Sequence, residues 1–214
     1  MTLSDEPVDL EVRPPLQKRS REAWARVLDA GVGILEEGGY EAFTISSVCE
    51  RAGVAPRALY ERVDTKDALF LAVYEHGMSA LVADHTRFDD SAAWRRLSTE
   101  QAVDRAVREL VSLFRRHAAL LRSVVLISGV HAEVSRRGSA YTRDLGDRFT
   151  ARLLDAGAAA SSSHPERDVR AAYEVAFSAL VVRTAYGPGF SGGPASDRVF
   201  ADGLRRMVAG FLES

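Results

Sequence analysis

The sequence predicts an all-α protein of about nine helices. Apolar residues recur at intervals of three and four along most of the chain, which is the spacing of one face of a helix. No segment alternates apolar and polar residues for long enough to form a strand. The chain has 214 residues, of which 46% are hydrophobic and 27% are charged, so it can bury a core of its own.

Four predicted helices occupy the first part of the chain. Their apolar stripes lie within residues 20–38, 45–53, 56–63 and 64–81. Thr44 can cap the second helix, because its hydroxyl can accept a hydrogen bond from a backbone N–H of the first turn. Gly53 ends that helix, and Pro56 suits the first turn of the third. Asp64 or Thr65 caps the fourth.

Five further helices are predicted in the remainder of the chain. Their apolar stripes cover residues 103–114, 120–127, 141–153, 169–181 and 200–211. The stretch at 120–127 is apolar all round, which predicts a helix buried on every side. Polar residues interrupt the pattern at 84–98, where Trp94 is isolated, and at 129–138. Small and polar residues predict loops at 158–165 and 187–194.

Composition and charge exclude several classes of protein. A net charge of -2 argues against a chain that coats nucleic acid non-specifically, although it allows a local DNA-binding surface. No run approaches the roughly 20 apolar residues of a membrane helix, and the acidic N-terminus has no apolar signal segment. Cys49 is the only cysteine, and its place on an apolar stripe predicts a small buried side chain. These features favour a cytoplasmic protein.

No enzymatic site is predicted. The five histidines are widely spaced and none lies three or four residues from another, so no metal and no other cofactor is expected. The segment Gly189–Pro194 looks like the sequence around the nucleophile of chymotrypsin-like serine proteases, but Phe190 stands where those enzymes have aspartate. That fold also needs two β-barrels, and no strands are predicted here. The segment is therefore interpreted as a loop.

Residues 45–63 have the spacing of a helix-turn-helix, in which the second of two short helices enters the major groove of DNA. The surrounding residues make the pattern specific. They are Gly38-Gly39-Tyr40, Thr44, Ile45, Val48, Ala52-Gly53-Val54, Leu59-Tyr60, Lys66 and Ala68-Leu69. On these residues, the segment from Ala30 to Leu69 resembles the TetR family of bacterial transcriptional regulators. The rest of the chain matches that family only in being helical and of typical length.

The resemblance implies a regulator that binds double-stranded DNA through its N-terminal helices. The residues that match DNA-backbone contacts of the family are Thr44, Tyr60 and Lys66, and those that match its groove contacts are Ala55, Pro56, Arg57, Ala58 and Glu61. The chemistry agrees: Tyr60 follows the apolar Leu59 and should point outward, where its phenol can donate to a phosphate. Arg57 can donate two hydrogen bonds to a guanine. The alternative is that these are ordinary surface side chains.

The segment also departs from the family pattern. Ala55 stands where serine is common, so the third helix loses a side-chain cap. Arg62-Val63 stands where histidine-phenylalanine is frequent, and Glu61 and Asp64 place negative charge near the predicted DNA face. These departures bear on the operator sequence and the affinity more than on the fold.

The resemblance and the composition together suggest three parts. Residues 1–19 form a flexible arm, 20–68 a helix-turn-helix DNA-binding domain, and 69–214 a ligand-binding and dimerisation domain. The arm is acidic and then basic, and is interpreted as a disordered tail or as a basic arm that touches DNA. The expected protein is a homodimeric, ligand-responsive repressor that reads a palindromic operator. The alternative is a helical protein–protein adaptor that retains the motif without binding DNA.

Two further sets of residues are predicted in the C-terminal part. In the family, two helices from each subunit form the dimer, and the matching apolar stripes contain Tyr173, Phe177, Leu180, Phe200, Leu204, Met207, Val208 and Phe211. Those stripes could instead be ordinary core. Residues 103–153 mix aromatic and polar side chains, which predicts a cavity for an apolar or aromatic effector. With one residue of the following helix, its candidates are Phe114, His117, Arg122, His131, Tyr141, Phe149 and Phe177. His117 and Arg122 could instead face solvent.

Overall fold

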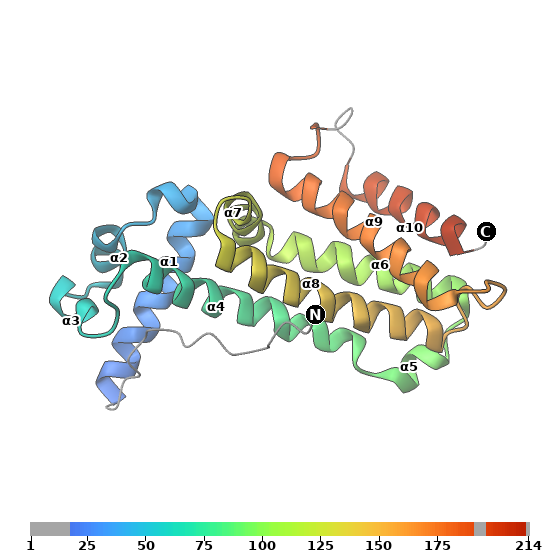
Figure 1. The fold of residues 1–214 in the computed structure, drawn as a ribbon, viewed down its shortest axis with the longest axis horizontal. Helices are drawn as coiled ribbons and strands as arrows, with labels where there is room; N and C mark the ends of the chain where they lie inside the picture. The colour runs from blue at the N-terminus through green and yellow to red at the C-terminus, as the bar shows by residue number, and fades with distance from the viewer. Residues whose placement is uncertain (1–17, 191–195, 213–214) are drawn as a thin grey trace. The chain divides into compact units, whose positions relative to one another are not determined.

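The computed structural model describes residues 18–190 and 196–212, and these residues contain no β-strand (Figure 1). The helices are α1 (Lys18–Ala42), α2 (Ile45–Ala52), α3 (Pro56–Tyr60), α4 (Lys66–Asp84), the 3₁₀ helix η1 (His85–Phe88), α5 (Ser91–Arg95), α6 (Thr99–Arg116), α7 (Ala118–Ser128), α8 (Ala132–Asp155), α9 (Pro165–Tyr186) and α10 (Asp197–Leu212). The all-α prediction is confirmed, with ten α-helices in the described ranges where about nine were expected. No helix in these ranges has the length and apolar character needed to cross a membrane. Residues 1–17 of the predicted arm, and residues 191–194 of the protease-like segment, lie outside the described residues.

The chain divides into two compact units, Met1–Ser79 and Ala80–Ser214, and the boundary falls inside α4. The first unit has an apolar core formed by α1, α2, α3 and the first part of α4. Its most buried members include Leu35, Phe43, Val48, Leu59, Leu69 and Val73. Gly31 allows α1 to approach α4 closely, because a Cβ at this position would lie only 2.9 Å from Cγ1 of Val73.

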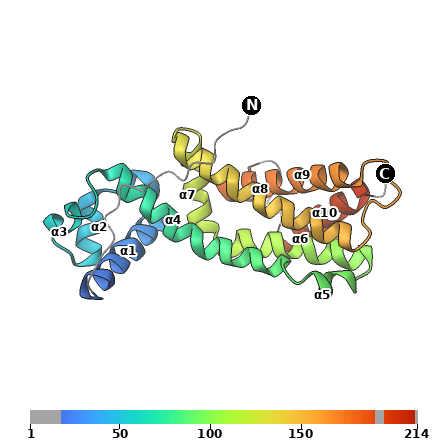
Figure 2. The ribbon, with the colours of Figure 1, turned by 60° about the horizontal axis from the view of Figure 1, so that its bottom comes forward.

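In the second unit, α6, α8, α9 and α10 lie side by side (Figures 1 and 2). A continuous chain of aromatic rings fills part of its interior. Consecutive ring centroids are 5.3 to 6.4 Å apart in the order Trp94, Phe88, Phe149, Tyr173, Phe177 and Phe114. Such ring pairs stabilise a core beyond the area that they bury.

The predicted interruption at residues 84–98 contains two short helices, η1 and α5. Trp94 is fully buried rather than isolated, and its ring stacks on Phe88 with an interplanar angle of 12°. The guanidinium of Arg105 lies 4.4 Å from the indole ring. Asp90 caps α5, because its carboxylate accepts a hydrogen bond from the N–H of Ala93 at 3.0 Å. Helices of four and five residues are too short to show an apolar period, which explains the difference.

α8 begins at Ala132, where the sequence predicted polar residues without regular structure up to residue 138. A ring nitrogen of His131 accepts a hydrogen bond from the first turn and so caps the helix. Glu133 forms ion pairs with Arg136 and Arg137 one turn further along. The hydrogen bond from Arg136 lowers the pKa of Glu133 to about 2, although burial acts in the opposite direction. Ion pairs between neighbouring side chains therefore stabilise the first turns of α8, where the sequence shows no apolar stripe.

One other helix differs from its prediction and one agrees with it. α7 is not buried on every side, because Leu126 is 48% exposed and Arg122 is also exposed. The first helix breaks at its predicted end, the glycine pair, because Gly39 leaves the helical region with φ 67° and ψ -165°. A short turn beyond this break continues α1 to Ala42.

The C-terminal end of α4 is held by polar contacts within the second unit. Asp84 accepts hydrogen bonds from Arg116 at 3.0 Å and from His117 at 2.9 Å. Burial raises the pKa of Asp84, but these hydrogen bonds outweigh it and hold the pKa below its ordinary value. The next residue, His85, is buried, and its Nδ1 lies 2.9 Å from a carboxylate oxygen of Asp144 on α8. These contacts thus fix the end of α4 to the end of α6, and the residue after α4 to α8.

Gly146 provides a test of the packing between α8 and α9. A Cβ at this position would lie 2.6 Å from Cε1 of Tyr173, whose ring is buried. We expect Gly146→Ala to lower the free energy of unfolding by about 1–3 kcal/mol in urea denaturation, because the ring must move.

Gly129→Ala is the matched control for this substitution. No atom lies within 4 Å of a Cβ added at Gly129. Its φ of -69° suits any residue. We expect this variant to change the free energy of unfolding by less than about 1 kcal/mol. Equal stability changes in the two variants would contradict the close contact between α8 and α9.

Candidate nucleic-acid interface

Hydrogen bonds fix both ends of α2 within the helix-turn-helix. At its start, the N–H of Ser47 donates to Oγ1 of Thr44 and the N–H of Thr44 donates to Oγ of Ser47, both at 3.0 Å. At its end, Gly53 adopts the left-handed conformation, with φ 63° and ψ 41°. The predicted cap and the predicted end of this helix are therefore confirmed. Because both ends of α2 are fixed, the turn that leads into α3 also starts at a fixed place.

α3 is anchored by one buried residue and exposes the others. Leu59 is 2% exposed, whereas Tyr60 is 49% exposed, so the predicted outward orientation of the tyrosine is confirmed. The residues expected to face the DNA groove are all exposed, namely Ala55, Pro56, Arg57, Ala58 and Glu61. Ala55 is the N-cap residue of α3. It makes no side-chain hydrogen bond to the helix, as predicted, because alanine has no hydroxyl.

Lys66 has a partner that the sequence alone does not reveal. Its Nζ lies 4.2 Å from the ring centroid of Tyr40, within the range of a cation–π interaction. The Tyr40 ring packs edge-on against Phe70, with 4.8 Å between the ring centroids. Burial raises the pKa of the Tyr40 phenol, and the nearby Asp67 carboxylate acts in the same direction. The ammonium group is thus held in a defined, half-buried place at the start of α4.

The exposed residues of this region carry charges of both signs. Arg57 is positive, as is the half-buried Lys66, whereas Glu61 and Asp64 are exposed carboxylates. Thr44 is exposed as well, but its hydroxyl is already engaged with the capping serine. A phosphate at that place would therefore be held mainly by backbone N–H groups at the start of α2.

An ion pair between residues distant in sequence fastens α2 to α1. Two guanidinium nitrogens of Arg51 each lie 2.7 Å from a carboxylate oxygen of Glu37. The hydrogen bond from Arg51 holds the pKa of Glu37 below its ordinary value. No local spacing rule predicts this pair. Cys49, on the same helix, is 4% exposed, and burial raises the pKa of its thiol. The prediction of a small buried side chain at Cys49 is thus confirmed.

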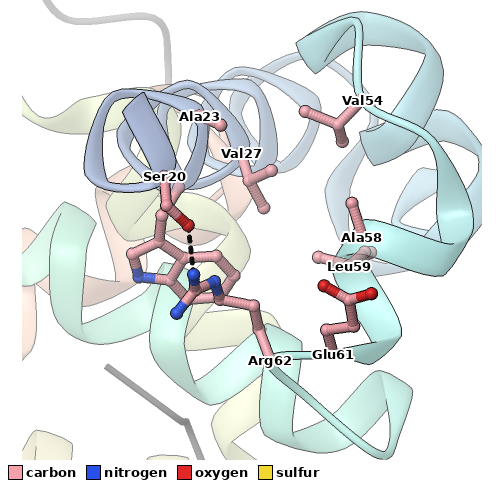
Figure 3. A pocket seen from close by; sticks show the side chains of 9 residues that line it. Ser20, Ala23, Val27, Val54, Ala58, Leu59, Glu61 and Arg62 are labelled. Carbon is pink, nitrogen blue, oxygen red and sulfur yellow. Dashed lines mark hydrogen bonds between the residues drawn. The ribbon is translucent and has the colours of Figure 1, made fainter. Parts of the chain in front are cut away.

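A pocket of about 80 Å³ lies between α1 and the segment around α3 (Figure 3). Val27 and Leu59 contribute apolar walls on facing sides. Arg62 donates a hydrogen bond to Oγ of Ser20 and so ties the turn after α3 to the start of α1. This pocket is smaller than the roughly 300 Å³ of typical ligand sites, so it does not suit an effector.

Apolar residues predicted to bind an effector come together in the second unit. Phe114, Phe149 and Phe177 belong to the aromatic chain described above, where Tyr173 joins them. Tyr141 is half-buried on α8. An apolar molecule at these rings would have to replace existing ring contacts.

The polar effector candidates lie elsewhere and have structural roles. Arg122 is exposed on α7, so its predicted place in an internal cavity is wrong. His117 pairs with Asp84, and His131 caps α8. In residues 18–190 and 196–212, no three His, Cys, Asp or Glu side chains gather in an arrangement that could hold a metal ion.

Half of the predicted dimer residues belong to the core of the single chain. The four residues that are at most 5% exposed are Tyr173, Leu180, Leu204 and Val208. Their prediction as contacts with a second subunit is wrong, because they pack inside their own unit. The others remain partly accessible: Phe177, Phe200 and Met207 are half-buried and Phe211 is 43% exposed.

Comparison with known proteins agrees with this arrangement. Residues 27–73 match the sequence profile of the bacterial regulatory proteins of the tetR family. The HTH-type transcriptional repressor KstR of Mycolicibacterium smegmatis is 32% identical over 141 residues, which cover 64% of this chain and 65% of that protein.

Solved structures of low sequence identity share the fold. A TetR transcription regulator from Haloarcula marismortui superimposes with a TM-score of 0.67 at 15% identity, over 91% of this chain and 97% of that one. A bacterial regulatory protein of the tetR family from Rhodococcus gives a TM-score of 0.65 at 22% identity, over 89% and 96% of the two chains.

The fold and the exposed third helix define a helical protein of the helix-turn-helix class. Its residues 27–73 match the tetR family of bacterial regulatory proteins, and 141 of its residues are similar to a transcriptional repressor.

Proposed function

We propose that the chain is a transcriptional regulator that binds double-stranded DNA and acts as a repressor. The proposal rests on the orientation of α3. Leu59 of this helix is buried, whereas Arg57 and Tyr60 are exposed. A recognition helix offers its outer face to the major groove in this way. Similarity to a protein named as a transcriptional repressor supports the direction of regulation. A protein–protein adaptor would keep the same helix without binding DNA.

Each residue has a role in this proposal that follows from its chemistry. Arg57 donates hydrogen bonds to O6 and N7 of a guanine, since its guanidinium matches both acceptors. The other residues that face the groove are Ala55, Pro56, Ala58 and Glu61, and those that contact the DNA backbone are Thr44, Tyr60 and Lys66. Residues 20–68 form the DNA-binding domain and 69–214 the sensing and dimerising domain. α4 begins in the first compact unit and ends in the second.

DNA binding is tested by fluorescence anisotropy with duplex DNA from upstream of the chain's own gene. Lys66→Ala should weaken binding similarly on all sequences and reduce the slope of log K against log salt by about 0.9, because one phosphate contact is lost. Arg57→Ala should cost about 1–3 kcal/mol and relax specificity at one base position.

Arg96→Ala is the control, because this arginine is exposed in the second unit, and it should bind DNA like the wild type. A wild-type chain that shows no sequence-specific binding would favour the adaptor. Wild-type affinity in both Arg57→Ala and Lys66→Ala would show that the DNA face lies elsewhere.

The proposed regulator is a homodimer that reads a palindromic operator. α10 carries exposed apolar side chains, since Val199 is 58% and Phe211 is 43% exposed. Met207 is half-buried on the same helix. Gly203 and Gly210 have open space beside them, which allows close approach of a second helix. Such an apolar face favours contact with a second copy, and two-fold symmetry would repeat the recognition helix on two half-sites.

Aspartate substitutions on α10 test the dimer. Met207→Asp combined with Phe211→Asp should convert a dimer to a monomer at micromolar concentration, measured by light scattering, because two carboxylates would be buried at the interface. Leu126→Asp is the control, since this leucine is 48% exposed on α7. A wild-type chain that is monomeric at micromolar concentration would contradict this part of the proposal.

The last part of the proposal is an apolar or aromatic effector that binds at the aromatic chain of the second unit. Phe114, Phe149 and Phe177 support it, because apolar ligand sites are mainly lined by such rings. The effector changes DNA affinity only as far as it binds two states of the protein with different affinity. Asp84 and His85 connect the end of α4 to the helices around those rings. The anisotropy experiment, repeated with candidate compounds, tests this part.

A further inference from the structure

A groove of about 380 Å³ lies on the second unit, between α6, α10 and η1. Its volume falls within the roughly 300–1,000 Å³ of small-molecule sites. None of the residues that line it belongs to the DNA face, the dimer residues or the aromatic chain discussed above. The groove therefore needs an explanation of its own.

Three arginines surround this groove. Arg108 and Arg115 are seven residues apart on α6, so they lie two turns apart on the same side of that helix, about 10 Å along its axis. Arg87 joins them from η1. The only carboxylate in the lining is that of Glu109. The lining thus has a net charge of +2, whereas the whole chain has a net charge of -2.

The ion pairs that these arginines make within the chain are weak. Arg108 pairs with Asp104 at 2.8 Å, but its side chain is 69% exposed, and an exposed pair of this kind contributes little. Arg87 lies 3.5 Å from Glu109 and 3.4 Å from Asp84, which are long distances for an ion pair. Arg115 is exposed and has no carboxylate partner among the described residues.

The rest of the lining is small or apolar. Val111 lies between the two arginines of α6, and Ala201 faces them from α10. The Ser112 hydroxyl accepts a hydrogen bond from Arg116 and is already engaged. The groove thus combines guanidinium donors with a short apolar surface.

We propose that this groove binds a small anion that carries two phosphate or carboxylate groups. Guanidinium groups match both kinds of oxyanion with two parallel hydrogen bonds. Arg108 and Arg115 hold the charged ends, and the centre of the molecule lies on Val111. Asp84 and Glu109 compete with the ligand for Arg87, so the two arginines of α6 make the main contacts. This site is separate from the aromatic chain, and its occupation does not require DNA binding.

Calorimetric titration of the full chain with pyrophosphate and with succinate, at constant ionic strength, tests the proposal. We expect saturable binding of at least one of the two anions by the wild type. R108Q/R115Q should weaken that binding by tenfold or more. Both substituted side chains are exposed, so the variant should fold, which its circular dichroism and melting temperature check. R96Q/R143Q removes the same charge from other exposed positions of the same unit and should bind like the wild type.

Preference for pyrophosphate would assign a phosphate-bearing ligand, and preference for succinate a dicarboxylate. Failure of both anions to saturate the wild type would overturn the proposal. Equal weakening in R96Q/R143Q would also overturn it, because it would show general attraction to positive charge rather than a site. DNA affinity of the two double variants, measured in parallel, reports separately on the proposed function.

Discussion

The burial of one leucine orients the surface on which the proposed function depends. α3 has five residues and no side-chain cap, so it is too short to be stable by itself. Leu59 holds it in place, with Val27 of α1 on the facing side of the small pocket (Figure 3). Because Leu59 is inside, Arg57 and Tyr60 lie outside. The hydrogen bonds around Thr44 and the ion pair between α1 and α2 fix the helix from which this turn starts.

Polar contacts within the second unit hold the C-terminal end of α4. Asp84 and His85 are adjacent in sequence, yet they contact different helices, since Asp84 binds Arg116 and His117 while His85 binds Asp144. The start of the same helix carries Lys66, which lies over an aromatic ring in the first unit. α4 therefore begins in the unit proposed to bind DNA and ends in the unit proposed to bind the effector.

The features that the sequence predicts correctly are those set by local spacing. Thr44, Gly53 and Leu59 act within a few residues of themselves, so the helix-turn-helix could be derived from a short segment. Contacts between distant helices follow no such rule. Tyr173 has the same place on an apolar stripe whether it meets its own chain or a second copy, and the prediction of a dimer contact was wrong for that reason. Trp94 lies in a five-residue helix with no period to detect, so its burial was not predicted.

Two neighbouring substitutions, Leu59→Ala and Tyr60→Ala, test the orientation of α3 most directly when stability and DNA affinity are both measured. We expect Leu59→Ala to lower the free energy of unfolding by about 2–5 kcal/mol, because it removes a buried anchor. Tyr60→Ala should change that free energy by less than about 0.5 kcal/mol. It should weaken DNA binding about tenfold, because one hydrogen bond to a charged phosphate is lost. Wild-type DNA affinity in Tyr60→Ala, or a loss of stability as large as that of Leu59→Ala, would contradict an outward-facing Tyr60 that contacts DNA.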